Sequence, residues 1–149
     1  MKKKWIIKRF EALSTTELYA ALQLRSEVFV VEQNCVYQDL DGKDLKALHL
    51  IGTLDDHVVA YARLFQQGEY FENASIGRVV VAEKHREKNL GHELMREAIS
   101  GIEKHFGKKA ITISAQLYLQ KFYEFHGFER TSEMYLEDDI PHIEMKLQA

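Results

Sequence analysis

Residues 76–94 constrain the fold most, because they join a strand pattern directly to a helix pattern. Residues 76–81 are rich in β-branched side chains, residues 82–89 are mostly polar, and from Leu90 onward apolar residues recur at helical spacing. A strand, a short loop and the start of a helix are therefore predicted in succession. The first turn of such a helix offers backbone N–H groups that have no partner within the helix and carry partial positive charge.

The loop before this helix has the features of a phosphate site. Helix starts bind phosphate through their free N–H groups, and Gly91 lets a ligand approach the backbone closely because it has no Cβ atom. Arg86 and Lys88 add positive charge. The alternative is an ordinary surface loop with a glycine at the helix start, and the loop alone does not decide between the two.

Alternating and helical patterns take turns along the whole chain, as is typical of a mixed α/β domain. Ser14 and Glu17 form a capping-box sequence, and helical spacing continues to Phe29, which predicts a helix of about four turns. Two more helices are predicted over residues 90–106 and 117–126. The predicted strands cover residues 5–10, 49–54, 58–65, 76–81, 110–114, 128–135 and 142–147.

Length and composition limit the classes of protein that remain. The 149 residues suit a single domain spanning residues 1–149. The net charge of −3 argues against a nucleic-acid partner, and Cys35, the only cysteine, excludes an internal disulfide and a Cys-rich zinc site. The seven histidines show no metal-ligand spacing, so no metal is expected. The apolar run at residues 5–7 ends at Lys8, too short for a signal peptide or membrane span, so we expect a cytoplasmic protein without a membrane partner.

A second motif supports the phosphate interpretation. The motif lies at the end of the predicted helix 117–126 and continues through the glycine that stops it. Its residues are Phe122, Tyr123, Gly127 and Phe128. Together with Arg86 and Gly91, this motif resembles the GCN5-related N-acetyltransferase (GNAT) superfamily, which carries an Arg/Gln-x-x-Gly-x-Gly/Ala loop and a later Asn-x-x-Ala-x-x-Phe-Tyr-x-x-x-Gly-Phe helix. The sequence departs from these family motifs at Asn89, Gln116 and Leu119.

Two further segments are similar to the ElaA-like branch of that superfamily. Residues 29–39 resemble its N-terminal signature and residues 140–145 its C-terminal end. The resemblance covers essentially the whole chain. It implies the α/β (α+β) GNAT fold, a single domain with a central mixed, mostly antiparallel sheet flanked by helices, in which the fourth and fifth strands splay apart.

The resemblance also implies acetyl-CoA as co-substrate and transfer of its acetyl group to a primary amine by direct attack in a ternary complex. Backbone N–H groups of residues 86–92 would hold the pyrophosphate, and the strand at residues 79–81 would pair with the pantetheine arm and stabilise the developing oxyanion. Alternatives are another acyl-CoA or a non-catalytic acyl-CoA sensor. The residues expected to contact the cofactor are Val79, Val80, Val81, Arg86, Glu87, Lys88, Asn89, Leu90, Gly91, His92, Gln116 and Phe122.

Tyr123 stands at the position of the family's general acid. A phenol, with a pKa of about 10, is a suitable proton donor for a departing thiolate. The alternative is that Tyr123 only packs beside its aromatic neighbours. The general base is open, either a water chain or one of five candidates, namely Glu32, His49, Glu83, His142 and Glu144.

The acceptor is expected to be a small-molecule or peptide amine, with Glu32, Arg63 and His142 as candidate contacts. Arg63 lies in an apolar strand, so it either faces a cleft or pairs with a carboxylate. Cys35 is an alternative acyl-accepting nucleophile. A homodimer, the commonest homo-oligomer, stays open. A negative loop would suit a cationic amine, or would be a solvated acidic turn, and its carboxylates are Asp39, Asp41 and Asp44.

Overall fold

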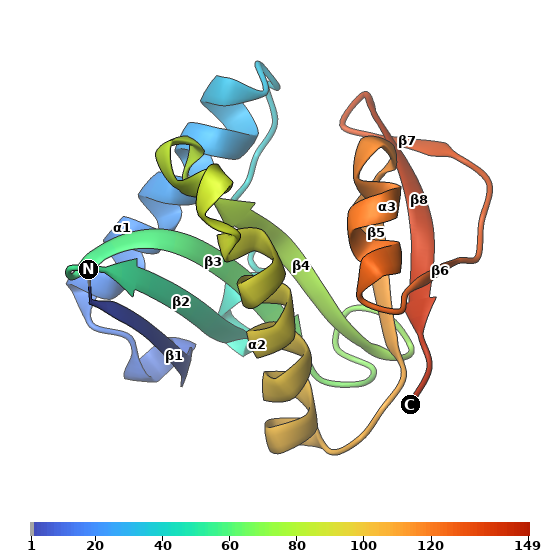
Figure 1. The fold of residues 1–149 in the computed structure, drawn as a ribbon, viewed down its shortest axis with the longest axis horizontal. Helices are drawn as coiled ribbons and strands as arrows, with labels where there is room; N and C mark the ends of the chain where they lie inside the picture. Colours follow the sequence, from blue (N-terminus) through green and yellow to red (C-terminus); the bar gives the residue numbers. More distant parts are fainter. Residues whose placement is uncertain (1) are drawn as a thin grey trace.

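The computed structural model describes residues 2–149, which form an eight-stranded sheet with helices on both faces (Figure 1). The strand order is β1-β2-β3-β4-β5-β8-β6, and β7 also pairs with β8. All pairs are antiparallel except β4 with β5, so the predicted mixed, mostly antiparallel sheet is confirmed. The strands are β1 (Lys3–Arg9), β2 (Leu48–Leu54), β3 (His57–Phe65), β4 (Ala74–Val81), β5 (Ile111–Gln116), β6 (Glu129–Arg130), β7 (Tyr135–Glu137) and β8 (Ile140–Leu147).

The first helix begins where the capping box predicted. The Ser14 hydroxyl accepts a hydrogen bond from the Glu17 backbone N–H (3.0 Å), and the Glu17 carboxylate accepts one from the Ser14 N–H (2.8 Å). The α-helix then continues as a π-helical segment through the predicted Phe29. The helices are η1 (Phe10–Ala12), α1 (Thr15–Arg25), η2 (Ser26–Glu32), η3 (Lys43–Lys46), η4 (Glu83–Lys88), α2 (Leu90–Phe106), η5 (Leu117–Leu119) and α3 (Gln120–Phe125).

Strand alternation explains why α1 and α2 lie on opposite faces of the sheet. Successive side chains of a strand point to opposite faces. Leu50 of β2 belongs to the core cluster that includes Leu94 of α2, whereas the next residue, Ile51, belongs to a cluster with Leu24 of α1. The part of the sheet formed by β2 and β3 is therefore buried on both sides, and α2 is held with its start beside the end of β4 (Figure 1).

The parallel strands β4 and β5 separate soon after they meet, as Figure 1 shows. Within residues 2–149 they pair at Ala74–Ile111 and Ser75–Thr112 and no further. On its other side, β4 has a register shift against β3, at which Arg78 takes a φ of +50°. This β-bulge bends the strand away from β5. The predicted splay is confirmed, and one backbone edge of β4 is left without a strand partner in the described chain.

The predicted strand over residues 128–135 is wrong. The structure breaks it into β6 and β7, because side chains replace the ladder between them. The Ser132 hydroxyl accepts the Glu144 N–H (2.8 Å), and the Arg130 side chain donates to the Ser132 carbonyl (2.8 Å). The helix predicted over residues 117–126 also begins as a short 3-10 turn, and it stops before Gly127, whose φ is +93°.

Candidate active site

Two cavities meet between the diverging strands. The η4-side cavity lies between β4, η4, the start of α2 and α3, and the β8-side cavity lies between β4, β5 and the β7–β8 hairpin. A common set of residues lines both cavities, so they share a wall. These residues are Phe29, Gln33, Val79, Gln116, Leu119 and Tyr123.

The start of α2 keeps its backbone donors available. Asn89, the N-cap residue, has a φ of +61°, and its side chain makes no capping hydrogen bond within residues 2–149. Asparagine adopts this left-handed conformation more readily than most residues, which explains how it can stand where the family has glycine. Gly91 packs closely on Phe122, since a Cβ atom there would lie 3.3 Å from the ring. The segment has the form of an anion site.

Arg86 and Glu32 were predicted in different roles, and the structure brings them together at the η4-side cavity. Each Arg86 terminal nitrogen contacts one Glu32 oxygen, with Nη2 at 2.8 Å, and Nε donates to the Val81 carbonyl at 3.1 Å. The hydrogen bonds from Arg86 lower the pKa of Glu32, and those to Glu32 raise the pKa of Arg86. Arg86 therefore reaches the predicted phosphate region already paired with a carboxylate.

The other predicted cofactor residues divide into two groups. Val79, Val80 and Val81 line the η4-side cavity, as do Gly91, Gln116 and Phe122. In the part of the chain that the structure describes, the remaining predicted residues do not line it, which leaves their backbone contacts as a prediction. These residues are Glu87, Lys88, Asn89, Leu90 and His92.

His92 is engaged with α3 and its end instead. Its Nδ1 lies 2.8 Å from Nε2 of His126, and its ring packs on Phe122 with the centroids 4.8 Å apart. Burial, together with the charges of His92 and Arg96, lowers the pKa of His126 to about 4. The pair is therefore neutral at His126 and fastens the start of α2 to the end of α3.

Tyr123 packs and also lines both cavities. It is 6% exposed, and its ring lies edge-on to Phe122 and Phe128. Burial raises the pKa of Tyr123, so its hydroxyl stays protonated well above neutral pH. Its place on the shared wall suits a proton donor, a role that stays a prediction.

Arg63 is paired with carboxylates and also lines the β8-side cavity. Its side chain is 1% exposed and donates to both oxygens of Asp41 (2.9 Å each) and to Asp44 (3.1 Å). Burial acts to raise the pKa of Asp41, but hydrogen bonds from Arg63 and the Lys43 N–H outweigh it and lower that pKa to about 2. The structure therefore bears out both alternatives, since Arg63 is paired with carboxylates and also forms part of the wall of the β8-side cavity.

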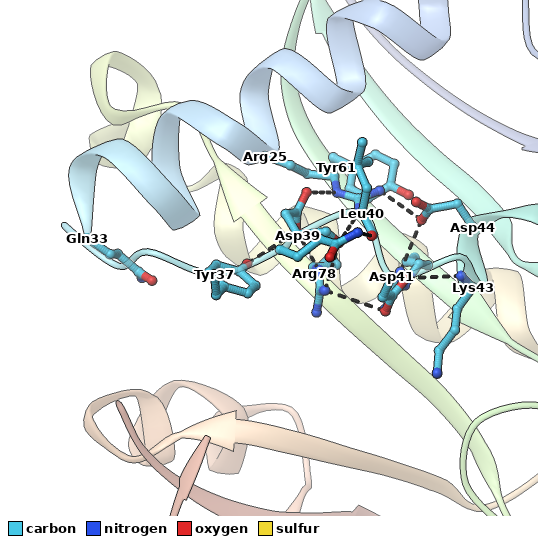
Figure 2. A network of polar contacts seen from close by, with 12 residues as sticks. Arg25, Gln33, Tyr37, Asp39, Leu40, Asp41, Lys43, Asp44, Tyr61 and Arg78 are labelled. Carbon is cyan, nitrogen blue, oxygen red and sulfur yellow. Dashed lines mark hydrogen bonds and ion pairs between the residues drawn. The ribbon is translucent and has the colours of Figure 1, made fainter. Parts of the chain in front are cut away.

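The acidic loop is neutralised by arginines, so its predicted attraction for a cationic amine is wrong. Besides Arg63, Arg25 donates to Asp39 (2.9 Å) and Asp44 (2.8 Å), and Arg78 donates to Asp39 (2.7 Å). Figure 2 shows this network around the loop. It is not a solvated turn either, because Asp39 and Asp44 are buried. The network fixes the loop against β3 and β4 beside the β8-side cavity.

Three base candidates lie away from both cavities. His49 is buried, with Nδ1 2.6 Å from the Tyr61 hydroxyl and Nε2 2.9 Å from the Asp44 carbonyl, so both of its nitrogens are already bonded. Glu83 and Glu144 line neither cavity within the described residues. Glu32 and His142 remain, on opposite sides of the shared wall.

Sequence reasoning missed the polar residues around His142. The Ser114 hydroxyl lies 2.5 Å from the Tyr135 hydroxyl and donates to Glu137 (3.1 Å), and His142 lies 3.5 Å from Glu137. The signal was the Asp138–Asp139 pair, which has φ values of +52° and +63° and makes a two-residue hairpin turn. Such a turn pairs Tyr135 with His142, as the register shows.

No helix within residues 2–149 is both long and apolar enough to cross a membrane, and these residues contain no group of three potential metal ligands. Residues 13–149 match the model of the acetyltransferase (GNAT) domain family. This chain therefore belongs to the GNAT acetyltransferase family, whose fold is an acyltransferase fold.

Within the family the chain is similar to ElaA. It is 44% identical to Protein ElaA of Escherichia coli over 144 residues, which cover 95% of this chain and 94% of that protein. The crystal structure of Escherichia coli ElaA aligns with a TM-score of 0.92 at 42% identity, covering 99% of this chain and 100% of that one. An acyl-CoA N-acyltransferase from Pseudomonas aeruginosa aligns with a TM-score of 0.91 at 44% identity, covering 97% and 99%.

Proposed function

We propose that this protein transfers an acetyl group from acetyl-CoA to a primary amine by direct attack within a ternary complex. Family membership supports acyl transfer. The observation that carries the proposal is the shared wall, because a donor in the η4-side cavity and an acceptor in the β8-side cavity would meet at Tyr123. No covalent acyl-enzyme is then required.

The η4-side cavity fits an acyl-CoA in its chemistry. The N–H groups at the start of α2 would hold the pyrophosphate, and the free edge of β4 at Val79–81 would pair with the amide groups of the pantetheine arm. When bound, acetyl-CoA supplies the thioester whose carbonyl carbon the amine attacks. A backbone N–H on this edge would stabilise the charge that develops on the carbonyl oxygen.

Residues of this chain then handle the charges and the protons. Tyr123 keeps its proton because it is buried, so it would protonate the thiolate that leaves. Arg86 would exchange Glu32 for a phosphate oxygen, since guanidinium binds both groups in the same geometry. Cys35 lines the β8-side cavity and would serve as wall rather than as nucleophile.

Ligand binding and thiol release test the proposal together. CoA and acetyl-CoA should each raise the melting temperature, and a panel of primary amines should release CoA thiol from acetyl-CoA with the wild type. Cys35→Ala should keep that activity. Binding of either ligand without thiol release on any amine would favour an acyl-CoA sensor, and release from a longer acyl-CoA alone would favour another acyl donor. A chain that neither ligand stabilises is inconsistent with all three readings.

A further inference from the structure

The tautomer of His142 is fixed by its backbone contact. Nδ1 lies 2.7 Å from the Ile140 carbonyl oxygen, which can only accept, so Nδ1 carries the proton. In the neutral ring, Nε2 is then a bare acceptor. It lies 3.5 Å from Oε2 of Glu137, which is also an acceptor. The His142 side chain is 8% exposed and the Glu137 side chain 43%, so two acceptors face each other at a site that is buried on the His142 side and open to solvent on the Glu137 side.

The Glu137 carboxylate is held toward this site by a chain of hydroxyl groups. Burial raises the pKa of Tyr135, so its hydroxyl keeps its proton and donates to Ser114 (2.5 Å), which donates in turn to Oε1 of Glu137 (3.1 Å). Because this chain occupies Oε1, Oε2 is left for a donor that comes from the cavity. Ser114, Glu137 and His142 all line the β8-side cavity.

The charges around the cavity are uneven. Arg63 and Arg78 line it, but both are paired with carboxylates of the loop. On the opposite side, Asp138 also lines the cavity, and it pairs with no basic side chain within residues 2–149. The hairpin side is therefore negative, whereas the side of β3 and the segment after it includes the rings of Phe65 and Phe71.

We infer that Glu137 and His142 bind the ammonium group of the acceptor, and that the acceptor is an amine with an apolar stem and no carboxylate beside its nitrogen. The inference rests on the proposed function and names its acceptor class. An ammonium group has three N–H donors, which satisfy both facing acceptors and leave one for water or Tyr123. A carboxylate next to the nitrogen would be placed beside Glu137 and repelled.

The same two residues account for the proton that the amine must lose. His142 Nε2 takes one proton from the ammonium, which frees the nitrogen lone pair, and Glu137 stabilises the imidazolium that forms. The nitrogen then forms its bond to the acyl carbon as the carbon–sulfur bond breaks, and the thiolate takes the proton of Tyr123. The second amine proton restores Tyr123 through water, and His142 releases its proton to solvent.

Glu137→Gln is the sharpest test, because the glutamine amide would itself donate to His142 Nε2 and take the ammonium's place. With 2-phenylethylamine as acceptor, the KM of Glu137→Gln for this amine should be about tenfold or more above that of wild type, while the KM for acetyl-CoA stays unchanged. Asp139→Asn, in the same turn but not lining this cavity, is the matched control and should behave as wild type. Wild type should also prefer 2-phenylethylamine to phenylalanine by about tenfold or more in kcat/KM.

Nitrogen NMR of the histidine rings tests the site without turnover. The His142 signals, assigned with His142→Gln, should show the Nδ1–H tautomer and should shift when 2-phenylethylamine is added to wild type but not to Glu137→Gln. An Nε2–H tautomer, or no shift in wild type, overturns the inference.

The two proposals fail in different ways. If wild type acetylates amines and Glu137→Gln leaves the amine KM unchanged, the ammonium site is wrong and the acetyltransferase stands. If acetyl-CoA binds but no amine releases thiol, the proposed function fails, and the NMR result alone decides whether Glu137 and His142 bind an ammonium group.

Discussion

In the proposed function, single residues carry the proton transfer and the phosphate binding. Asn89 is one example, because it replaces the family's glycine and still adopts a left-handed backbone conformation at the start of α2. Tyr123 and Arg86 likewise have two sets of partners, one seen in the structure and one proposed for the bound state. Substitution at these positions separates packing from chemistry.

Tyr123→Phe should lower kcat by about 100-fold and leave the affinity for acetyl-CoA unchanged, because it removes the proposed proton donor but keeps the ring. Steady-state thiol release and a CoA titration measure the two effects. Tyr19→Phe, at an exposed position on α1, is the control. An unchanged kcat in Tyr123→Phe would assign this residue to packing alone.

Glu32→Gln should tighten CoA binding by roughly two- to fivefold, because it releases Arg86 from an ion pair of the surface type, worth at most about 1 kcal/mol. Isothermal titration with CoA measures this change. Glu27→Gln alters the charge equally on the same helical segment at an exposed residue and should leave affinity unchanged. Weaker binding in Glu32→Gln would show that Glu32 supports the ligand instead of competing with it.

Among the elements, the strands β1 and β2 are joined by an unusually close contact. Trp5 lies directly opposite Gly52, and a Cβ atom at Gly52 would come within 2.4 Å of the indole ring. The indole also donates to Glu93 at the start of α2 (3.0 Å). The absence of a side chain at Gly52 thus lets one ring connect the sheet edge to the helix.

Gly52→Ala should lower the free energy of unfolding by about 1–3 kcal/mol, because the indole must move and lose its bond to Glu93. Urea unfolding followed by circular dichroism measures it. Gly77→Ala is the matched control in β4, since a Cβ atom there meets nothing within 4 Å, and its effect should stay within about 0.5 kcal/mol. Equal losses in both variants would argue against the close contact as the cause.

The elements predicted from sequence are those with strong local signals. The capping box at Ser14 and the long apolar face of α2 placed their helices correctly, because capping and periodicity are local. The break between β6 and β7 was missed, since it depends on the Ser132 hydroxyl meeting a backbone N–H twelve residues away. Because the break was not predicted, the β7–β8 hairpin and the position of Glu137 beside the cavity were not predicted either.

At the scale of the whole molecule, the loop between η2 and β2 is held by three arginines and three aspartates (Figure 2). The arginines come from α1, β3 and β4, so the network ties together segments far apart in the sequence. Local patterns do not report such long-range pairing, which is why neither sequence alternative, an attraction for a cationic amine or a solvated acidic turn, included the arginines. The position of the two cavities depends on the same long-range packing.

The network should make the free energy of unfolding fall as the pH is lowered. The folded pKa of Asp41, about 2, lies below its ordinary value of 3.8, so its charged form stabilises the fold above about pH 4 and that contribution is lost as the pH falls through 2. We expect wild type to lose on the order of 2 kcal/mol between pH 4 and pH 2 from this group, measured by urea unfolding with Trp5 fluorescence.

Asp41→Asn should show a shallower dependence over that range, because it has no proton to take up. Asp56→Asn, in the exposed β2–β3 turn, should keep the wild-type dependence. If Asp41→Asn unfolds with the same acid slope as wild type, the Arg63–Asp41 pair is not the source of the effect.

The wall that the two cavities share has a kinetic consequence. Whatever fills the space beside η4 becomes part of the surface that the next molecule meets at Phe29, Val79 and Tyr123. The affinity of the second molecule then includes contacts with the first, so the order of addition matters. Initial rates measured while the concentrations of acetyl-CoA and amine are both varied should give intersecting rather than parallel double-reciprocal lines. The amine should also bind more tightly once acetyl-CoA is bound.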